Sequence, residues 1–329
     1  MLGFAIIGCG KIAHRHAQLI KEFGKLIAVY DIDEQKGRLF ADRYDTVFYA
    51  SYDLLLTSKL QIDVLVICAP NWLHAPYSIK ALNAGFHVLC EKPMAIHYTD
   101  CVEMIRAADK NQRQLFIVKQ NRFSPPVAQA KQLIEEKELG KLYSFHIGCF
   151  WNRNKEYYED SWHGKIYEDG GTLFTQFSHF IDILYWLMGE VKEVRAVTKN
   201  FAHPLIQFED TGAVLFEMQS GAIGTLHYTV NSFEKNMEGS FTIIGEKGTI
   251  KIGGEYLDSM EYLTIKKAEN SVDPVHCNHK VPHLCRHSKV YENLINVLLN
   301  GEQVYLDAHH ALKTVEIIEK IYNAAKFKD

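Results

Sequence analysis

The chain has 329 residues, with 36 lysines and arginines against 40 aspartates and glutamates, and a formal net charge of −4. It is 47% hydrophobic and 12% aromatic, which is too much apolar surface for a disordered protein. The absence of a basic excess argues against nucleic acid as the main partner, and no apolar run approaches the ~20 residues that span a bilayer. We therefore expect two globular domains and, because no charged leader precedes the first strand-like segment, a cytoplasmic location.

Short apolar runs alternate with helical patterns in the first third of the chain. Residues from Ile12 to Phe23 follow helical spacing up to Gly24, and Pro76 and Gly85 are expected to begin and end a second helix. The runs between such helices are consecutive and partly β-branched, as in strands buried on both faces. This alternation predicts a doubly wound α/β domain with a parallel sheet. The expected strands cover residues 5–7, 26–30, 64–68, 88–90 and 115–118.

The first expected strand is followed by a G-x-G-x-x-A pattern that runs from Gly8 to Ala13. Its first glycine permits a tight turn, Gly10 lets the backbone approach a pyrophosphate, and the small third residue lets helix and strand pack closely. The N-terminus of the helix then offers N–H groups to phosphates. Asp31 lies about 20 residues further on, at the end of the second expected strand, where a carboxylate accepts hydrogen bonds from ribose and repels a 2′-phosphate. The pattern favours NAD over NADP.

Polar residues follow two more expected strands. Asn71 and His74 come after the run that ends at Cys68, and Glu91 and Lys92 come after the run that ends at Cys90. Ligands of doubly wound sheets bind beyond the carboxyl ends of the strands. We therefore expect both segments to lie at the cofactor site.

The motifs G-C-G-K-I-A-x-x-H, C-A-P-N-x-x-H and E-K-P, with a later G-G-T-L-x-x-x-x-S-H-x-x-D, resemble the glucose–fructose oxidoreductase, inositol dehydrogenase and MocA (Gfo/Idh/MocA) family over the whole chain. The resemblance implies a Rossmann doubly wound parallel sheet followed by an α+β domain with a large open, mostly antiparallel sheet. It also implies oxidation or reduction of sugars and cyclitols with NAD(P), and homodimers or homotetramers formed through the second sheet. The implied cofactor contacts are Gly8, Gly10, Lys11, Ile12, Asp31, Ala69, Asn71, His74, Glu91 and Gln120.

The chain beyond Gln120 carries a helical pattern at 125–138 and then a series of strand-like runs. The runs lie at 143–151, 191–199, 213–218, 223–230, 241–244 and 249–252, with a hairpin turn expected at 246–248. They predict a separate, largely antiparallel layer. We expect an NAD-binding domain at 1–120 and a substrate-binding and oligomerisation domain at 121–329. An amphipathic helix at about 307–326, with Asp307 as a plausible cap, ends the chain, and the resemblance implies that it packs back on the first domain.

Two side chains are the candidates for catalysis. An ammonium group at Lys92 can stabilise negative charge on a substrate oxygen or relay its proton, and the resemblance gives the lysine of E-K-P this role. The imidazole of His179 can take a hydroxyl proton near neutral pH while hydride leaves for NAD. Thr175, His179 and Asp182 are spaced to share one face of a helix. Asp182 is expected either to orient His179 or to form a structural bridge.

Thr175 departs from the family pattern, because many members have an aspartate four residues before the histidine. Threonine cannot act as a base, which weakens an assignment as an inositol dehydrogenase. The segments K-Q-N-R-F and Y-Y-x-x-S-W-H-G resemble UDP-N-acetylglucosaminuronic acid 3-dehydrogenases instead. Arg122 could bind a carboxylate or phosphate with its planar fork, and Tyr158 and Trp162 are either stacking faces for a base or sugar or ordinary core or lid residues. The expected substrate contacts are Asn121, Arg122, Tyr158, Trp162, His163, Thr175, Gln176 and His287.

A cluster of metal-ligand residue types occupies a short stretch near the C-terminus. It consists of His276, Cys277, His279, His283, Cys285 and His287. Its spacing matches no paired zinc motif, so we expect no metal and place this stretch at the border of the substrate site.

The sequence thus predicts an NAD-dependent enzyme that takes hydride from a sugar hydroxyl. The favoured substrate is a UDP-N-acetylated sugar or uronic acid of surface-polysaccharide biosynthesis, and the hydride is expected to leave from its C3. The alternatives are another sugar or cyclitol dehydrogenase, an NAD-dependent glycosidase, and a catalytically silent NAD-binding regulator. Fold alone cannot choose among them, because function lies in the site.

Overall fold

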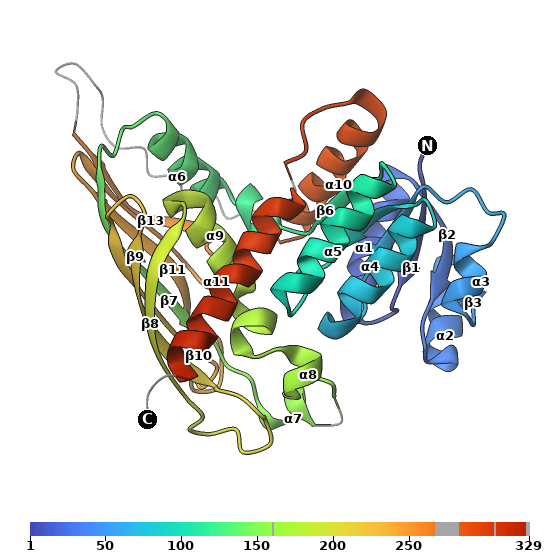
Figure 1. The fold of residues 1–329 in the computed structure, drawn as a ribbon, viewed down its shortest axis with the longest axis horizontal. Coiled ribbons are helices and arrows are strands. Elements are labelled where there is room, and N and C mark those ends of the chain that lie inside the picture. The colour runs from blue at the N-terminus through green and yellow to red at the C-terminus, as the bar shows by residue number, and fades with distance from the viewer. Residues whose placement is uncertain (160, 267–282, 306, 327–329) are drawn as a thin grey trace. The chain divides into compact units, whose positions relative to one another are not determined.

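The computed structural model describes residues 1–159, 161–266, 283–305 and 307–326. The chain divides into two compact units. The first unit comprises Met1–Lys119 and His283–Val315, and the second comprises Gln120–Pro282 and Glu316–Asp329. The division at Lys119 is one residue from the predicted boundary. Figure 1 shows the elements of both units. No described helix combines the length and apolar character needed to cross a membrane.

The first unit is built on a parallel sheet with strand order β3-β2-β1-β4-β5-β6. Every residue of β1 and β4 is buried, which confirms strands covered on both faces. The strands are β1 (Gly3–Ile7), β2 (Lys25–Tyr30), β3 (Val47–Tyr49), β4 (Val64–Ile67), β5 (His87–Cys90) and β6 (Leu115–Ile117). The helices among them are α1 (Lys11–Phe23), α2 (Glu34–Tyr44), α3 (Tyr52–Leu56), the 3-10 turn η1 (Asn71–Leu73), α4 (His74–Asn83) and α5 (Tyr98–Lys110).

The start of α4 differs from the prediction. The helix begins at His74, so Pro76 is its third residue rather than its first. The position is tolerated because the first four N–H groups of a helix have no partner within the helix. The helix ends at Asn83, and Gly85 follows with a φ of +92°, which only glycine adopts readily.

Helix α10 (His283–Asn300) belongs to the first unit, whereas the sequence placed residues 121–329 in the second domain. The reason is a long-range contact: Tyr291 of α10 is fully buried, and its hydroxyl lies 2.7 Å from Nδ1 of His16 on α1. Its ring stacks on Phe23 with centroids 5.8 Å apart. The domain prediction is therefore corrected for this helix.

The last helix, α11 (Ala308–Lys326), contributes residues to both units. The Asp307 carboxylate accepts a hydrogen bond from the N–H of His309 at 2.8 Å, which confirms Asp307 as a cap. Lys119 Nζ donates to the carbonyl of Asp307 at 2.9 Å within the first unit. Beyond Val315, Tyr322 donates to Glu209 within the second unit. The predicted packing on the first domain therefore fits only the first part of this helix.

The second unit is built on a mostly antiparallel sheet with strand order β13-β12-β11-β7-β10-β9-β8. Only the β7–β10 pair is parallel among the strands described. The strands are β7 (Leu142–Phe150), β8 (Val191–Lys199), β9 (Thr211–Met218), β10 (Ile223–Thr229), β11 (Glu238–Gly245), β12 (Gly248–Gly253) and β13 (Ser259–Ile265). The hairpin predicted at 246–248 joins β11 to β12. The sequence did not predict β13, a largely exposed edge strand.

The helices of the second unit cover one face of its sheet (Figure 1). They are the 3-10 turn η2 (Gln120–Phe123), α6 (Pro125–Glu135), α7 (Lys155–Tyr158), α8 (Ile166–Asp169), the π-turn η3 (Leu173–Phe177) and α9 (Ser178–Met188). On this face Phe145, Phe216 and Phe241 are buried. On the opposite face Val197, Leu215 and Ile223 remain about half exposed. A single helix was expected where η3 and α9 lie, and the π-turn replaces its first part.

Candidate active site

The turn between β1 and α1 has the geometry that the glycine pattern predicts. Gly8 has a φ of +94°, and a β-carbon there would lie 2.8 Å from the backbone N of Ala69. Around Gly10 the nearest atom to such a β-carbon is Nζ of Lys36 at 4.0 Å, so the space beside the backbone is open. Helix α1 begins at Lys11, followed by Ile12, and its first turn contains no acidic residue. The turn therefore fits a dinucleotide, whose pyrophosphate would approach Gly10 and the helix N-terminus.

Asp31 lies beside this turn. Its carboxylate accepts hydrogen bonds from the N–H of Cys9 at 2.7 Å and the N–H of Asp33 at 2.9 Å. Nζ of Lys36 is 3.7 Å away. The side chain is buried and fixed at the end of β2, where the adenine ribose of a bound dinucleotide is expected.

The loop after β5 holds Lys92 through its neighbour Glu91. The Glu91 carboxylate accepts from the Lys92 N–H at 3.1 Å and lies 2.9 Å from Nε2 of His16. Burial would raise the pKa of Glu91, but the hydrogen bond and charge of His16, followed by the charges of His287 and Lys92, outweigh it and lower the pKa to about 2. Glu91 is thus a buried anion that fixes the backbone of Lys92, and its predicted cofactor contact stays a prediction.

His74 has a structural role that the sequence analysis did not predict. Its Nδ1 lies 2.6 Å from the carbonyl of Pro93, and its Nε2 lies 2.8 Å from the carbonyl of Ala69. Burial lowers the pKa of this imidazole, while the two carbonyl contacts raise it. Because both ring nitrogens face backbone oxygens, His74 links the loops after β4 and β5, and its predicted cofactor contact stays a prediction. Asn71, which begins η1 in the same loop, is also buried.

The place of His287 differs from the predicted one, and its predicted substrate contact stays a prediction. His287 lies inside α10 rather than before a helix, and it is buried in the first unit. Its ring is 6.3 Å from that of His16, in an edge-on arrangement. The remaining members of the histidine and cysteine cluster are not described: residues 276, 277 and 279 lie outside the described residues, as do the side chains of residues 283 and 285.

In the second unit, η3 and α9 separate side chains that were expected to share a face. The Thr175 hydroxyl donates to the carboxylate of Asp169, which also accepts from the Gly164 N–H at 2.8 Å. Asp182 instead accepts two hydrogen bonds from Arg122, at 2.7 and 2.6 Å. Thr175 lies in the π-turn η3, whereas His179 and Asp182 both lie in α9, so the α-helical spacing predicted for the three holds only for the last two. Asp182 forms the structural bridge, and Arg122 is corrected as a carboxylate or phosphate ligand because its fork is already occupied.

His179 stands at the second position of α9, against aromatic side chains. Its ring centroid is 5.4 Å from that of Trp151 and 4.6 Å from that of Phe180. The guanidinium of Arg153 lies over the same Trp151 ring at 5.1 Å. A base in such a half-buried aromatic setting is held in one orientation by packing, as proton transfer requires.

The other predicted substrate residues gather around Arg153 and Tyr157. Gln176 accepts from Nε of Arg153 at 2.7 Å and donates to the Tyr157 hydroxyl at 2.8 Å. Trp162 and His163 stack on each other with centroids 3.9 Å apart, and the His163 ring is 4.4 Å from that of Tyr157. Tyr158 is buried and meets Tyr157 edge-on.

Two adjacent amides near the start of the second unit have oxygens with no described partner. Oε1 of Gln120 and Oδ1 of Asn121 are buried, and no hydrogen bond to either is present among the described residues. A buried carbonyl oxygen without a donor costs free energy. Both amides therefore fit the ligand contacts predicted for them.

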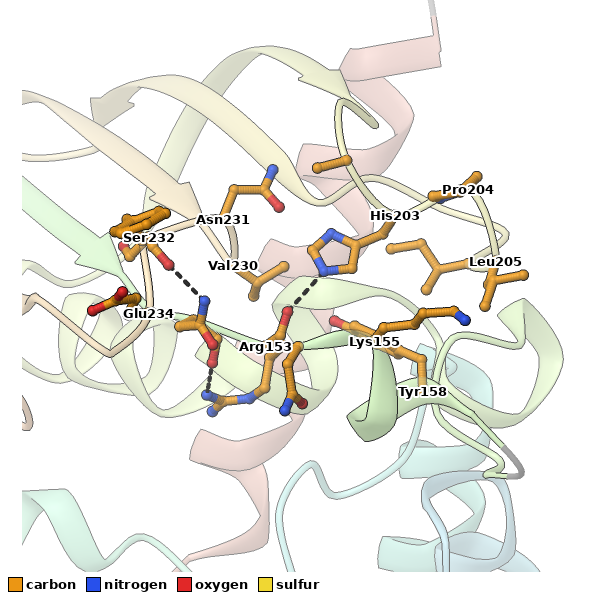
Figure 2. Close-up of a pocket in the computed structure, with 15 residues that line it drawn as sticks. Arg153, Lys155, Tyr158, His203, Pro204, Leu205, Val230, Asn231, Ser232 and Glu234 are labelled. Carbon is orange, nitrogen blue, oxygen red and sulfur yellow. Dashed lines mark hydrogen bonds between the residues drawn. The ribbon is translucent and has the colours of Figure 1, made fainter.

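A pocket of about 570 Å³ opens beside Arg153 and Tyr158 in the second unit (Figure 2). Apolar side chains such as Leu205, Ile206 and Val230 form part of its lining, together with Arg153 and Tyr158. His203 forms part of one wall, and its Nε2 lies 2.8 Å from the Arg153 carbonyl (Figure 2). Its Nδ1 lies 3.2 Å from the Asp210 carboxylate.

Sequence reasoning missed Arg153, Tyr157 and Asp169. Arg153 is the third residue after β7, in a W-N-R-N-K stretch whose mixed aromatic, amide and basic residues were a usable signal. Asp169 precedes two glycines and resembles an ordinary helix end. Its contact with Thr175 depends on a backbone course that local spacing does not encode.

Comparison with known proteins agrees with this arrangement. Residues 2–119 match the oxidoreductase family with an NAD-binding Rossmann fold, and residues 127–251 match the GFO/IDH/MocA C-terminal domain. A 2,7-anhydro-N-acetylneuraminate hydratase of Escherichia coli is 31% identical over 77% of this chain and 68% of its own length. Inositol 2-dehydrogenase of Salmonella typhimurium is 27% identical over 75% of this chain and 72% of its own.

Among solved structures, the WlbA dehydrogenase of Chromobacterium violaceum, in complex with NADH and UDP-GlcNAcA, is 34% identical with a TM-score of 0.91. The match covers 99% of this chain and 94% of that one. The WlbA dehydrogenase of Bordetella pertussis, with the same two ligands, is 31% identical with a TM-score of 0.90, over 99% and 97% of the two chains. The chain therefore belongs to the GFO/IDH/MocA family of NAD-dependent sugar oxidoreductases, with NAD as its cofactor.

Proposed function

We propose that this enzyme oxidises the C3 hydroxyl of a UDP-N-acetylated sugar, with the uronic acid UDP-GlcNAcA as the favoured substrate. The observation that carries the proposal is the match over 99% of the chain to a dehydrogenase solved with NADH and UDP-GlcNAcA. The aspartate that many family members place before the histidine is Thr175 here, and Thr175 is bonded to Asp169. This arrangement supports a site that relies on lysine and histidine.

In the proposed mechanism, His179 takes the hydroxyl proton while Lys92 stabilises the negative charge that develops on the same oxygen. Glu91 fixes the Lys92 backbone, and Trp151 fixes the plane of the His179 ring. Gly8, Gly10 and Asp31 would hold NAD, which accepts the hydride when bound. Removal of the proton and the hydride leaves a ketone at C3.

The test is NADH formation by purified enzyme with NAD and UDP-GlcNAcA, with UDP-GlcNAc and myo-inositol as comparison substrates. We expect Lys92→Ala and His179→Ala each to lower kcat by about 100-fold or more, because each removes a group that acts on the reacting oxygen. Exposed Lys80→Ala and His309→Ala serve as matched controls and should behave as wild type. Unchanged kcat in both site variants would refute the mechanism, and turnover of myo-inositol alone would refute the substrate.

In a second candidate reaction, the hydride that NAD takes from the sugar is returned to the sugar before the product leaves, so that no net oxidation occurs. It is favoured by the 31% identity to a protein named as a hydratase, because hydration changes no net oxidation state. Such an enzyme, like an NAD-dependent glycosidase, would consume substrate without accumulating NADH. Mass spectrometry separates the candidates: the dehydrogenase product is lighter by two hydrogens, whereas the alternatives give a hydrated product or a released leaving group.

We further propose that the enzyme is a homodimer or homotetramer that associates through the outer face of its second sheet. Val197, Leu215 and Ile223 lie on that face and are 54%, 45% and 55% exposed. Exposed apolar side chains gathered on one face are typical of association sites. Light scattering on a sizing column should show an oligomer for wild type and a smaller species for Leu215→Lys. A monomeric wild type would refute this proposal.

A further inference from the structure

The second unit contains two buried or half-buried arginines whose charges are compensated differently. Arg122 is 1% exposed, and its fork forms a two-bond ion pair with Asp182. Such a pair neutralises both partners, so Arg122 has little charge left for a ligand. Arg153 differs because none of its bonds goes to a carboxylate.

The guanidinium of Arg153 is held entirely by neutral groups. Nε donates to Oε1 of Gln176 at 2.7 Å, and Nη1 donates to the Asn152 carbonyl at 2.5 Å and to Oδ1 of Asn236 at 3.2 Å. The rings of Trp151 and Tyr157 lie 5.1 and 5.4 Å from its central carbon. Among the described residues, no carboxylate lies at ion-pair distance from it. The nearest carboxylate in this hydrogen-bond network belongs to Glu255, and Asn236 lies between it and Arg153.

The other lysine or arginine that lines the pocket is compensated, because Lys155 is paired with Glu159 at 2.7 Å. A half-buried cation without a counter-ion is costly, because burial weakens its hydration while nothing replaces it. The guanidinium of Arg153 is therefore held in a fixed position, but its positive charge has no counter-ion among the described residues.

The position of Arg153 ties this charge to the proposed reaction. Trp151 contacts both the guanidinium and the ring of His179. Gln176, which accepts from Arg153, stands three positions before His179 in the chain. The pocket in Figure 2 includes Arg153 in its lining and offers space beside it. The ring of Trp151 therefore lies between an anion bound at the guanidinium and the imidazole of His179.

We infer that Arg153 is the anion-binding residue of the substrate site, and that its ligand is a carboxylate or phosphate group of the substrate. The inference rests on the proposed function for the identity of the substrate. It assigns to Arg153 the role that the sequence analysis predicted for Arg122. Two groups of the substrate could supply this anion, the uronate carboxylate and the diphosphate, and binding measurements distinguish between them.

The experiment is calorimetric titration of the NADH-loaded enzyme with UDP, UDP-GlcNAc and UDP-GlcNAcA, for wild type, Arg153→Gln and Arg153→Lys. A carboxylate ligand predicts that Arg153→Gln loses about 10–100-fold in affinity for UDP-GlcNAcA alone. A phosphate ligand predicts the same loss for all three compounds. Arg153→Lys keeps the charge without the fork and should recover part of the lost affinity.

Arg195→Gln is the matched control, because Arg195 is an exposed arginine paired with Glu193 on β8. It should bind all three compounds as wild type does. Thermal unfolding of each variant shows whether it is folded. If Arg153→Gln does not fold, the affinities of Arg153→Lys for the three compounds are compared with those of wild type instead. Equal affinities for all three compounds in folded Arg153→Gln and wild type would overturn the inference.

Binding and turnover keep this test separate from the proposed function. An enzyme that binds UDP-GlcNAcA through Arg153 but forms no NADH refutes the function and supports the inference. If wild type binds none of the uridine compounds, glucuronate and pyrophosphate become the probes. Binding of either that is lost in Arg153→Gln supports the inference, whereas no Arg153-dependent binding of either overturns it.

Discussion

The Asp31 carboxylate has two tasks at once. It accepts the backbone N–H groups of Cys9 and Asp33, which fixes the turn after β1 and the entrance to α2. We expect the same carboxylate to accept ribose hydroxyls of the bound cofactor and to repel a 2′-phosphate. Lys36, 3.7 Å away, is held by this charge. Cofactor choice and local structure therefore depend on the same two oxygen atoms.

Replacing Asp31 with serine should lower the affinity for NAD by about tenfold or more, since hydrogen bonds to a charged group are lost. The preference for NAD over NADP should also decrease, because the negative charge is removed while Lys36 remains. Calorimetric titration with NAD and NADP measures both effects. Asp31→Asn is the matched control: it keeps an acceptor for Cys9 and loses only the charge. An unchanged ratio of the two affinities in both variants would contradict this account.

Individual residues were predictable where their role follows from neighbours in the sequence. Gly8, Gly10 and Asp31 belong to a pattern that fixes their backbone positions, and the structure places them accordingly. The pairing of Arg122, rather than Arg153, with a carboxylate was not predictable. It depends on Asp182, 60 residues from Arg122 in the chain. No local pattern shows which arginine finds a carboxylate.

The π-turn η3 is held at its start by a buried acid. Glu209 accepts hydrogen bonds from the hydroxyls of Tyr228 at 3.0 Å and Tyr322 at 2.7 Å. The Tyr322 oxygen in turn accepts from the N–H of Leu173, the first residue of the turn. A β-carbon on Gly171 would lie 2.3 Å from the same oxygen. The sheet and the last helix thus fix the turn that precedes His179.

Burial raises the pKa of Glu209 to about 7, even though the two tyrosine hydroxyls lower it, and the charge of Asp169 adds to the increase. The folded state therefore holds this proton at a pH where the unfolded chain has released it. Stability from this group is present below the unfolded pKa and is lost as pH rises through about 7. The loss should amount to about 1–3 kcal/mol.

Glu209→Gln cannot release a proton and should not show this loss. Urea unfolding at pH 5 and pH 8 measures it, and the free energy of unfolding of the variant should rise relative to wild type between the two. Taking the difference between the proteins cancels titration elsewhere in the chain. Parallel changes in the two proteins would show that Glu209 does not titrate in this range.

Elements were predictable when their pattern was long and buried. Five of the six strands of the first sheet and the hairpin from β11 to β12 were found in this way, whereas the short edge strand β3, which has no buried residue, was missed. The π-turn was not, because its residues also fit an ordinary helix. Strand β13 was missed because it is an edge strand with most residues partly or fully exposed, so its apolar pattern is weak.

At the scale of the whole molecule, the first unit is assembled from two distant segments. Tyr291 joins them: its ring lies 5.9 Å from Phe4 of β1 and 5.8 Å from Phe23 of α1. Its hydroxyl meets Nδ1 of His16, whose other nitrogen faces Glu91. One side chain of α10 therefore supports the helix at the cofactor turn and, through Glu91, the backbone of Lys92.

Tyr291→Ala should lower the free energy of unfolding by about 3–5 kcal/mol, because it leaves a cavity between α1 and α10. Tyr291→Phe should cost less, about 1–3 kcal/mol, because only the partner of His16 is lost. Denaturant unfolding and hydrogen exchange of β1 and α1 measure these effects. Tyr167→Ala is the control, since Tyr167 is 83% exposed. Faster exchange confined to the second unit would contradict this role for Tyr291.

The two-segment construction of the first unit also sets an order of events during synthesis. His16 and Tyr291 are 275 residues apart, and a ribosome adds roughly 5–20 residues per second. The nascent N-terminal sheet thus waits tens of seconds for α10, with the apolar side of α1 uncovered. Residues after Val315 then complete the second unit, only a few positions later. Both units therefore reach their final form almost together, only after the segments that follow residue 282 have been synthesised.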